Sequence, residues 1–116
     1  MTRYLAWIAK QPYARAFFEA LPVLGKDGTL HDIQRESPAA GHVRAKTGTY
    51  SEDDALNRAL FVNGKGLAGY VDTKDGRRLA FCAYLNHVSV AKAPDAIREV
   101  AGEALGEIAA AAYDAR

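Results

Sequence analysis

The chain has 116 residues, of which 49% are hydrophobic and 25% are charged, and this length predicts one domain spanning residues 1–116. Its 15 basic and 14 acidic side chains leave a formal net charge of +1 and form no basic face, which argues against nucleic acid as a partner. No stretch approaches the roughly 20 apolar residues that a membrane-spanning helix needs.

The N-terminal segment predicts two short helices. Leu5 and Ile8 fall on one face of a helix over residues 2–10. Pro12 suits the first turn of a second helix that runs to about Ala20. Charged residues interrupt the whole segment, so it does not read as a signal peptide, and we expect the chain to stay where it is made.

The middle of the chain predicts a strand followed by a loop. Residues 42–50 place Val43, Ala45 and Thr47 on one side of an alternating pattern, which is typical of a strand. Residues 51–66 are polar and glycine-rich and predict a long loop, which is usually functional or mobile. Lys65, between two glycines, reads as a residue of that loop.

A β-hairpin follows. LAGYVDT and RRLAFCAYLNHV are β-rich runs joined by Lys74-Asp75-Gly76, and Asp-Gly is a strong turn pair. The second run, residues 78–86, is apolar on both sides, which predicts a strand covered by a layer on each face. The single cysteine, Cys82, lies in this run and is interpreted as a small buried hydrophobe.

The C-terminal residues 94–113 predict an alanine-rich helix with one apolar stripe. Gly102 and Gly106 permit a close approach of another backbone to this helix. The order helix–helix–strand–hairpin–helix predicts an α+β fold, in which the N-terminal and C-terminal helices pack on a small antiparallel sheet of about three strands.

The predicted strand at 42–50 carries Lys46-Thr47-Gly48-Thr49, a sequence with specific chemistry. Lysine supplies a positive charge, a threonine hydroxyl can bind a carboxylate, and glycine leaves space for a ligand backbone at the strand edge. The backbone N–H of Thr49 is able to stabilise an oxyanion. K-T-G is the third sequence box of class A β-lactamases and penicillin-binding proteins, beside S-x-x-K and S-D-N.

The neighbouring sequence supports this comparison. GHVRAKTGTY followed by LAGYVDTKDGRRLAFCAYLNHV resembles the C-terminal part of D-alanyl-D-alanine carboxypeptidases of the low-molecular-mass penicillin-binding type. LPVLGKDGTL resembles the segment that precedes this strand in those enzymes, so the resemblance covers roughly residues 2–112. It implies a partial β-lactamase/penicillin-binding α/β domain, and the family works outside the cytoplasmic membrane.

The resemblance also implies a reaction and site residues. The reaction is hydrolysis of the terminal D-Ala-D-Ala bond of peptidoglycan stem peptides through an acyl-serine, and we expect no cofactor. Lys46 would supply the catalytic electrostatics of the cleft. Thr47 and Thr49 would hold the substrate carboxylate and carbonyl, and Gly48 would admit the substrate backbone.

The nucleophile of that family is missing. It lies in an S-x-x-K box far upstream of K-T-G, with S-x-N or Y-x-N between them, and the 45 residues before Lys46 hold neither. Ser89-Val90-Ala91-Lys92 and Tyr84-Leu85-Asn86 fit the two patterns but follow K-T-G, so we interpret them as coincidences. The chain alone is therefore expected to be inactive.

No metal site is expected either. His31, His42 and His87 have no ligand spacing among them, and Glu52-Asp53-Asp54 is typical of a solvated segment, because adjacent residues do not face each other.

Two interpretations remain. In the first, the chain is one wall of a serine hydrolase, and it binds a peptidoglycan peptide or a β-lactam when an N-terminal half completes it. In the second, it is a non-catalytic remnant or a self-associating binding module of the same fold. The strand at 78–86 would leave an unpaired sheet edge, which predicts a homo-oligomer formed through that edge.

Overall fold

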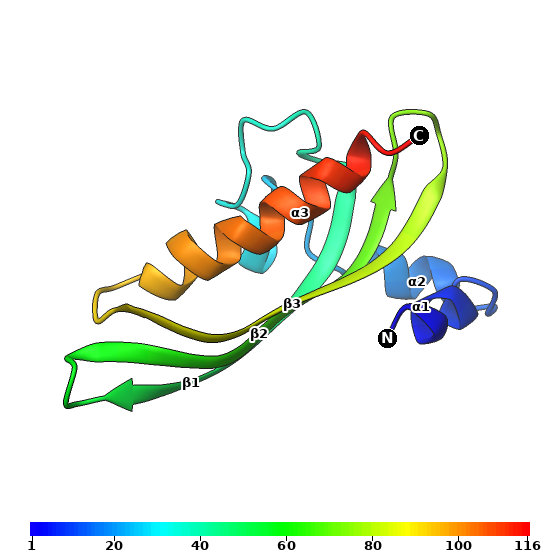
Figure 1. Cartoon of the computed structure of the whole chain (residues 1–116). Coiled ribbons are helices and arrows are strands. Elements are labelled where there is room, and N and C mark those ends of the chain that lie inside the picture. The colour runs from blue at the N-terminus through cyan, green and yellow to red at the C-terminus, as the bar shows by residue number, and fades with distance from the viewer.

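The computed structural model describes residues 1–116 and has the α+β fold that the sequence predicts (Figure 1). In chain order the elements are α1 (Thr2–Ile8), α2 (Ala14–Glu19), the 3-10 turn η1 (Gly28–Leu30), β1 (Val43–Asp54), β2 (Ala59–Asp72), β3 (Arg78–Ala91), the π-helical turn η2 (Arg98–Gly102) and α3 (Glu103–Tyr113). None of the helices combines the length and the apolar character that crossing a membrane requires.

The three strands form one antiparallel sheet in the order β1-β2-β3, so β1 and β3 are its edges. Figure 1 shows a long twisted ribbon with α3 lying along one face, which we call the α3 face. The two N-terminal helices lie on the opposite side, the α1 face. There the hydroxyl of Tyr70 donates to the carbonyl oxygen of Leu5 at 2.8 Å, and the ring of Phe18 lies 5.8 Å from that of Tyr70.

The prediction of a long loop over residues 51–66 is wrong, because most of that segment is strand. β1 continues to Asp54, β2 begins at Ala59, and the two form a hairpin whose tip holds the exposed Leu56. The side chains of residues 51–54 are polar, but Leu60 and Val62 turn inward and pack with Val90. Residues 51–62 and 88–91 thus extend the sheet as an outer arm.

A β-bulge separates the outer arm from the rest of the sheet. The pairing of β1 with β2 slips by one residue next to Tyr50, which leaves Asn63 as the extra residue. Opposite this point on β3, His87 has a φ of 55°. The extra residue reverses the alternation of side chains, so that Val62 and Lys65 both face the C-terminal helix.

The main core lies between the sheet and α3. Its buried side chains come from the segment before β1, from β1 and β2, and from the helix: Leu24, Leu30, Ile33, Ala39, Val43, Ala45, Leu67, Val71, Leu105 and Ala109. A second, smaller cluster of Val62, Val90 and Ala96 holds the outer arm against the start of the helical segment. The residues around η1 are therefore fixed over the α3 face of β1.

The two helix glycines permit the close approach that the sequence predicts. A Cβ atom at Gly106 would overlap the Cγ2 of Ile33, and one at Gly102 would lie 3.3 Å from the Cδ1 of the same residue. The helical segment is widened at Gly102, where η2 precedes the regular turns of α3. Ile33 consequently packs directly on the helix backbone.

Only one face of β3 is well covered, so the prediction that residues 78–86 are covered by a layer on each face is wrong. Phe81, Ala83 and Leu85 pack on the main core. On the α1 face Tyr84 is 63% exposed, and Cys82 is half-buried where a buried side chain was expected. The reason is that α1 contacts only part of this strand, and Phe18 of α2 lies beside the first residue of the strand, Arg78.

Candidate functional site

The residues of the K-T-G segment lie together on β1 but point to two sides of the sheet. Thr47 and Thr49 pair with Leu67 and Lys65 of β2 and share the α3 face with them. Lys46 and Gly48 alternate with the threonines and therefore turn to the α1 face. A ligand can contact both sets only from the strand edge.

That edge of β1 is open from Lys46 onward. Before it, the chain segment at 22–24 covers the strand, because the N–H of Leu24 donates to Val43 at 2.9 Å and the N–H of Ala45 donates to Pro22 at 3.0 Å. Outward and inward backbone groups alternate along an antiparallel strand, so the N–H groups of Thr47 and Thr49 also point outward. No strand of this chain pairs with them.

The side chain of Lys46 is exposed beside this edge. Its Nζ donates to the carbonyl oxygen of Thr47 at 2.9 Å, and it forms no ion pair. A Cβ atom built on the neighbouring Gly48 would meet no atom within 4 Å. The surface around these two residues is thus open to a ligand.

A groove of about 630 Å³ runs along the α1 face next to these residues. Lys46, Gly48, Tyr84 and Asn86 border it on the sheet, and apolar side chains border it on the helical side: Met1, Tyr4, Leu5, Phe17 and Leu21. The groove is large enough for a small ligand. Tyr84 and Asn86, which match the Y-x-N pattern, lie in the same groove as Lys46.

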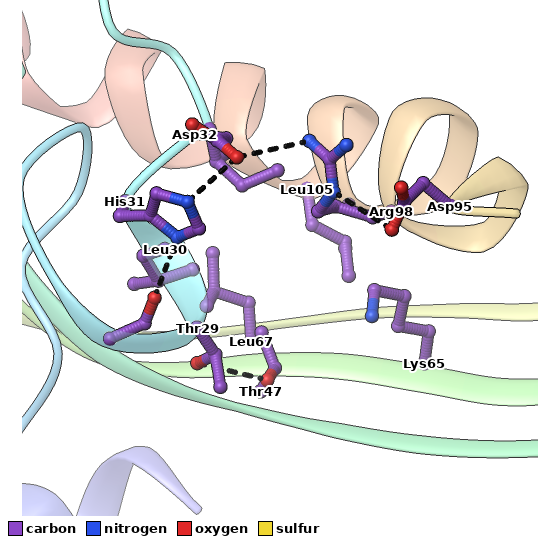
Figure 2. A pocket seen from close by; sticks show the side chains of 13 residues that line it. Thr29, Leu30, His31, Asp32, Thr47, Lys65, Leu67, Asp95, Arg98 and Leu105 are labelled. Atoms are coloured by element: carbon purple, nitrogen blue, oxygen red, sulfur yellow. Dashed lines mark hydrogen bonds and ion pairs between the residues drawn. The ribbon is translucent and has the colours of Figure 1, made fainter.

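A separate cavity of about 410 Å³ lies on the α3 face (Figure 2). Its walls are residues 28–33, which include η1, the strands β1 and β2, and the C-terminal residues 95–105, which include η2. On its upper wall Asp32 is within 2.7 Å of His31 Nε2, 3.6 Å of Arg35 Nη1 and 3.9 Å of Arg98 Nη1. The hydroxyl groups of Thr47 and Thr29, 3.4 Å apart, border the opposite wall.

Lys65 lines this cavity and was missed by sequence reasoning, which placed it in a loop. It lies on β2, is only 8% exposed, and donates from Nζ to the Thr49 hydroxyl at 2.9 Å. Burial, and next the positive charge of Lys46, lower the pKa of Lys65 from its ordinary 10.5. The sequence signal available was its place two residues before the buried Leu67.

The other candidates of the sequence are not brought into a catalytic arrangement. Ser89 pairs with Phe61 in the outer arm, and the Nζ of Lys92 lies 2.7 Å from a carboxylate oxygen of Asp53. The literal S-x-x-K match therefore has its lysine engaged by an acid. No group of three or more His, Cys, Asp or Glu side chains comes close enough to hold a metal ion.

Known proteins resemble this chain both in sequence and in fold. The sequence model of the D-Ala-D-Ala carboxypeptidase 3 (S13) family matches residues 1–105. Among solved structures, penicillin-binding protein 4 of Haemophilus influenzae matches with a TM-score of 0.63 and 22% identity, over 97% of this chain and 23% of that chain. This likeness shows a shared fold, and the chain spans about a quarter of the length of that protein. No curated protein matches the sequence.

Proposed function

Because this chain belongs to the D-Ala-D-Ala carboxypeptidase 3 (S13) family, we propose that residues 46–49 form the substrate-binding wall of a D-Ala-D-Ala carboxypeptidase-like site. The open edge of β1 beside the exposed Lys46 is the observation that carries the proposal. The predicted resemblance to the penicillin-binding D-alanyl-D-alanine carboxypeptidases is confirmed at the level of the family.

An extended peptide fits this edge as an added strand. The outward N–H groups of Thr47 and Thr49 are placed to donate to its backbone or to a developing oxyanion. Their hydroxyl groups are available to the substrate carboxylate and carbonyl, and Gly48 leaves room for the peptide backbone. Lys46, on the other side of the strand, supplies a positive charge to the groove on the α1 face.

The catalytic nucleophile in this proposal comes from outside residues 1–116. The family reaction passes through an acyl-serine, in which the serine oxygen bonds to the substrate carbonyl carbon and the terminal D-alanine leaves with a proton. Water then breaks the ester. Neither box needed for this step precedes Lys46, and Lys92 of the later match is paired with Asp53.

A fluorescent penicillin tests this function. The isolated chain is expected to remain unlabelled, and covalent label is expected only on an N-terminal segment bearing S-x-x-K when both parts are mixed. Lys46→Ala is expected to abolish that labelling. Labelling of the isolated chain, removed by Ser89→Ala, would show that the nucleophile lies within it and would contradict the proposal.

The alternative is a self-associating binding module, and one observation favours it. β3 is an edge strand that pairs only with β2, and its α1 face is half exposed. Natural proteins rarely leave such an edge uncovered. Sedimentation velocity in the presence of an N-terminal segment bearing S-x-x-K distinguishes this candidate, because it requires the homo-oligomer to persist when that segment is added.

A further inference from the structure

The cavity on the α3 face contains a buried positive charge without an acidic partner. Figure 2 shows the side chain of Lys65 rising from its strand with the amine turned into the cavity, while the guanidinium of Arg98 turns away toward Asp32. A lysine amine has three N–H donors. The hydroxyl of Thr49 accepts from the amine, and no other partner for it is present.

The remaining charges of the cavity are already paired. Arg98 lies 3.6 Å from Asp95, 3.7 Å from Glu99 and 3.9 Å from Asp32. His31 and Arg35 also approach Asp32. The Asp95 carboxylate is therefore paired with Arg98, and the Asp32 carboxylate is surrounded by cationic or histidine side chains. Lys65 is the one cationic side chain of the cavity that has no carboxylate partner.

A buried ammonium group without a counter-charge lowers the stability of the fold, since the protein replaces its hydration with a single neutral hydroxyl. Such a cost is expected where the charge is needed for a ligand. We propose that this cavity binds a small monocarboxylate, with Lys65 as its cationic anchor.

The surroundings favour a monoanion over phosphate. Asp32 and Asp95 also line the cavity, and although Arg98 lies near both and offsets part of their charge, they disfavour a second negative charge on the ligand. The Thr29 hydroxyl borders the same space, accepts from the Thr47 hydroxyl, and keeps its own proton to donate to the second carboxylate oxygen. Gly102 faces the lysine stem, since a Cβ atom there would lie 3.7 Å from the Cε of Lys65, in ordinary van der Waals contact.

This site goes beyond the proposed function, because it requires neither Lys46 nor a nucleophile. Lys46 lies on the α1 face, whereas the amine of Lys65 lies on the α3 face of the neighbouring strand. The two proposals can therefore fail separately, and different lysines report on them.

The test is a titration of the isotope-labelled full chain with sodium acetate, followed through its backbone amide NMR signals. Acetate is expected to shift the amides of Thr49, Lys65 and Gly102 saturably, whereas the neutral isostere acetamide is not. Lys65→Met is expected to weaken acetate binding by about tenfold or more, and Lys65→Arg to retain it. Lys10→Met, which removes an exposed charge of the N-terminal segment, is expected to leave it unchanged.

Three results would overturn the inference. One is the absence of saturable shifts at the cavity residues. Another is acetate binding that survives Lys65→Met or depends on Lys46, which would place the anion at the edge of β1. The third is tighter binding of inorganic phosphate than of acetate, which would contradict a monocarboxylate site.

Discussion

Gly48 and Gly69 lie on the neighbouring strands β1 and β2, but an added methyl group meets opposite surroundings at the two positions. At Gly69 a Cβ atom would overlap the carbonyl oxygen of Arg44 and the side chain of Ala45, whereas at Gly48 it enters open space. Gly48 is also not in the left-handed region of φ. The space above Gly48 is thus free for a ligand, and that above Gly69 is occupied by the fold.

The first prediction concerns this contrast. Gly48→Ala is expected to leave the melting temperature unchanged but to weaken binding of N-acetyl-D-alanyl-D-alanine by about tenfold, because the methyl group occupies the path of the ligand backbone. Amide shifts of residues 46–49 during titration measure the binding. Gly69→Ala serves as the comparison and is expected to lower stability by about 2 kcal/mol. Unchanged binding by Gly48→Ala would argue against a ligand at this edge.

Lys65 carries the second prediction. Its folded pKa lies below the ordinary 10.5, so between those two values the unfolded chain binds more protons than the folded chain. The contribution of this group to stability therefore rises with pH through that window, and below it the buried charge is a cost. Lys65→Met is expected to raise the free energy of unfolding at pH 7 by about 1 kcal/mol.

Urea unfolding of both proteins at pH 7 and near pH 10 measures this effect. The difference between them is expected to shrink at the higher pH, where the wild-type amine loses its proton. Lys46 and Arg98 are the nearby cations, and both remain in the variant, so the change is attributable to position 65. A variant that is less stable at both pH values would show that the bond to Thr49 outweighs the buried charge.

For single residues, the sequence predicts candidate site residues only where they belong to a short motif. Lys46 to Thr49 are recognisable because four consecutive residues carry the pattern and strand alternation places them. Lys65 is not recognisable, because its burial comes from the η1 segment and the C-terminal helix, which are distant in sequence. Two flanking glycines are typical of a loop, and the local pattern predicts one.

Among the elements, the strands were predicted better in the body of the sheet than in the outer arm. The LAGYVDT and RRLAFCAYLNHV runs are rich in β-forming residues and are joined by a turn in which Gly76 has a φ of 85°. In the arm the bulge at Asn63 inserts one residue, so a strict period of two fails there. Residues 51–54 are polar, so a prediction from the local sequence alone assigns them to a loop instead of a strand.

The packing of α3 on Ile33 leads to the third prediction. Gly106→Ala gains helix propensity of about 1 kcal/mol, but its methyl group overlaps Ile33, and overpacking costs about 1–3 kcal/mol. The overlap is expected to dominate, so that the variant is less stable by about 1 kcal/mol. Chemical denaturation measures the difference. Gly102→Ala is the matched comparison, because its methyl group would lie farther from Ile33, and it is expected to lose less stability. Equal losses of stability in the two variants would contradict overlap with Ile33 as the cause.

For the whole molecule, the three strands are ordered β1-β2-β3, so the unpaired edge that the sequence predicts at residues 78–86 is present. The chain spans 23% of the length of the Haemophilus protein with which it shares a fold. Local patterns predict the helices and the hairpin, but the coverage of a sheet face depends on what packs against it. This is why Tyr84 is exposed although its strand is apolar on both sides.

Self-association is the fourth prediction. The odd-numbered residues of β3 in this region bond to β2, so the N–H of Ala80 points to the open edge. Ala80→Pro removes this donor without breaking a bond of the sheet. The wild-type chain is expected to sediment as a homo-oligomer and the variant as a monomer. A wild-type monomer across concentrations would contradict pairing through this edge.

The bulge between the outer arm and the body of the sheet has a consequence for local unfolding. The arm is held by its own small cluster of Val62, Val90 and Ala96, separate from the main core. Regions with few buried contacts open at lower free energy than the global transition. Amide hydrogens of the arm are therefore expected to exchange with solvent sooner than those of Arg44, Lys46 and Gly48, whose N–H groups point to β2 in the body of the sheet. The proposed binding edge, residues 46–49, borders the arm on the side of the sheet body, so we expect it to stay closed while the arm opens.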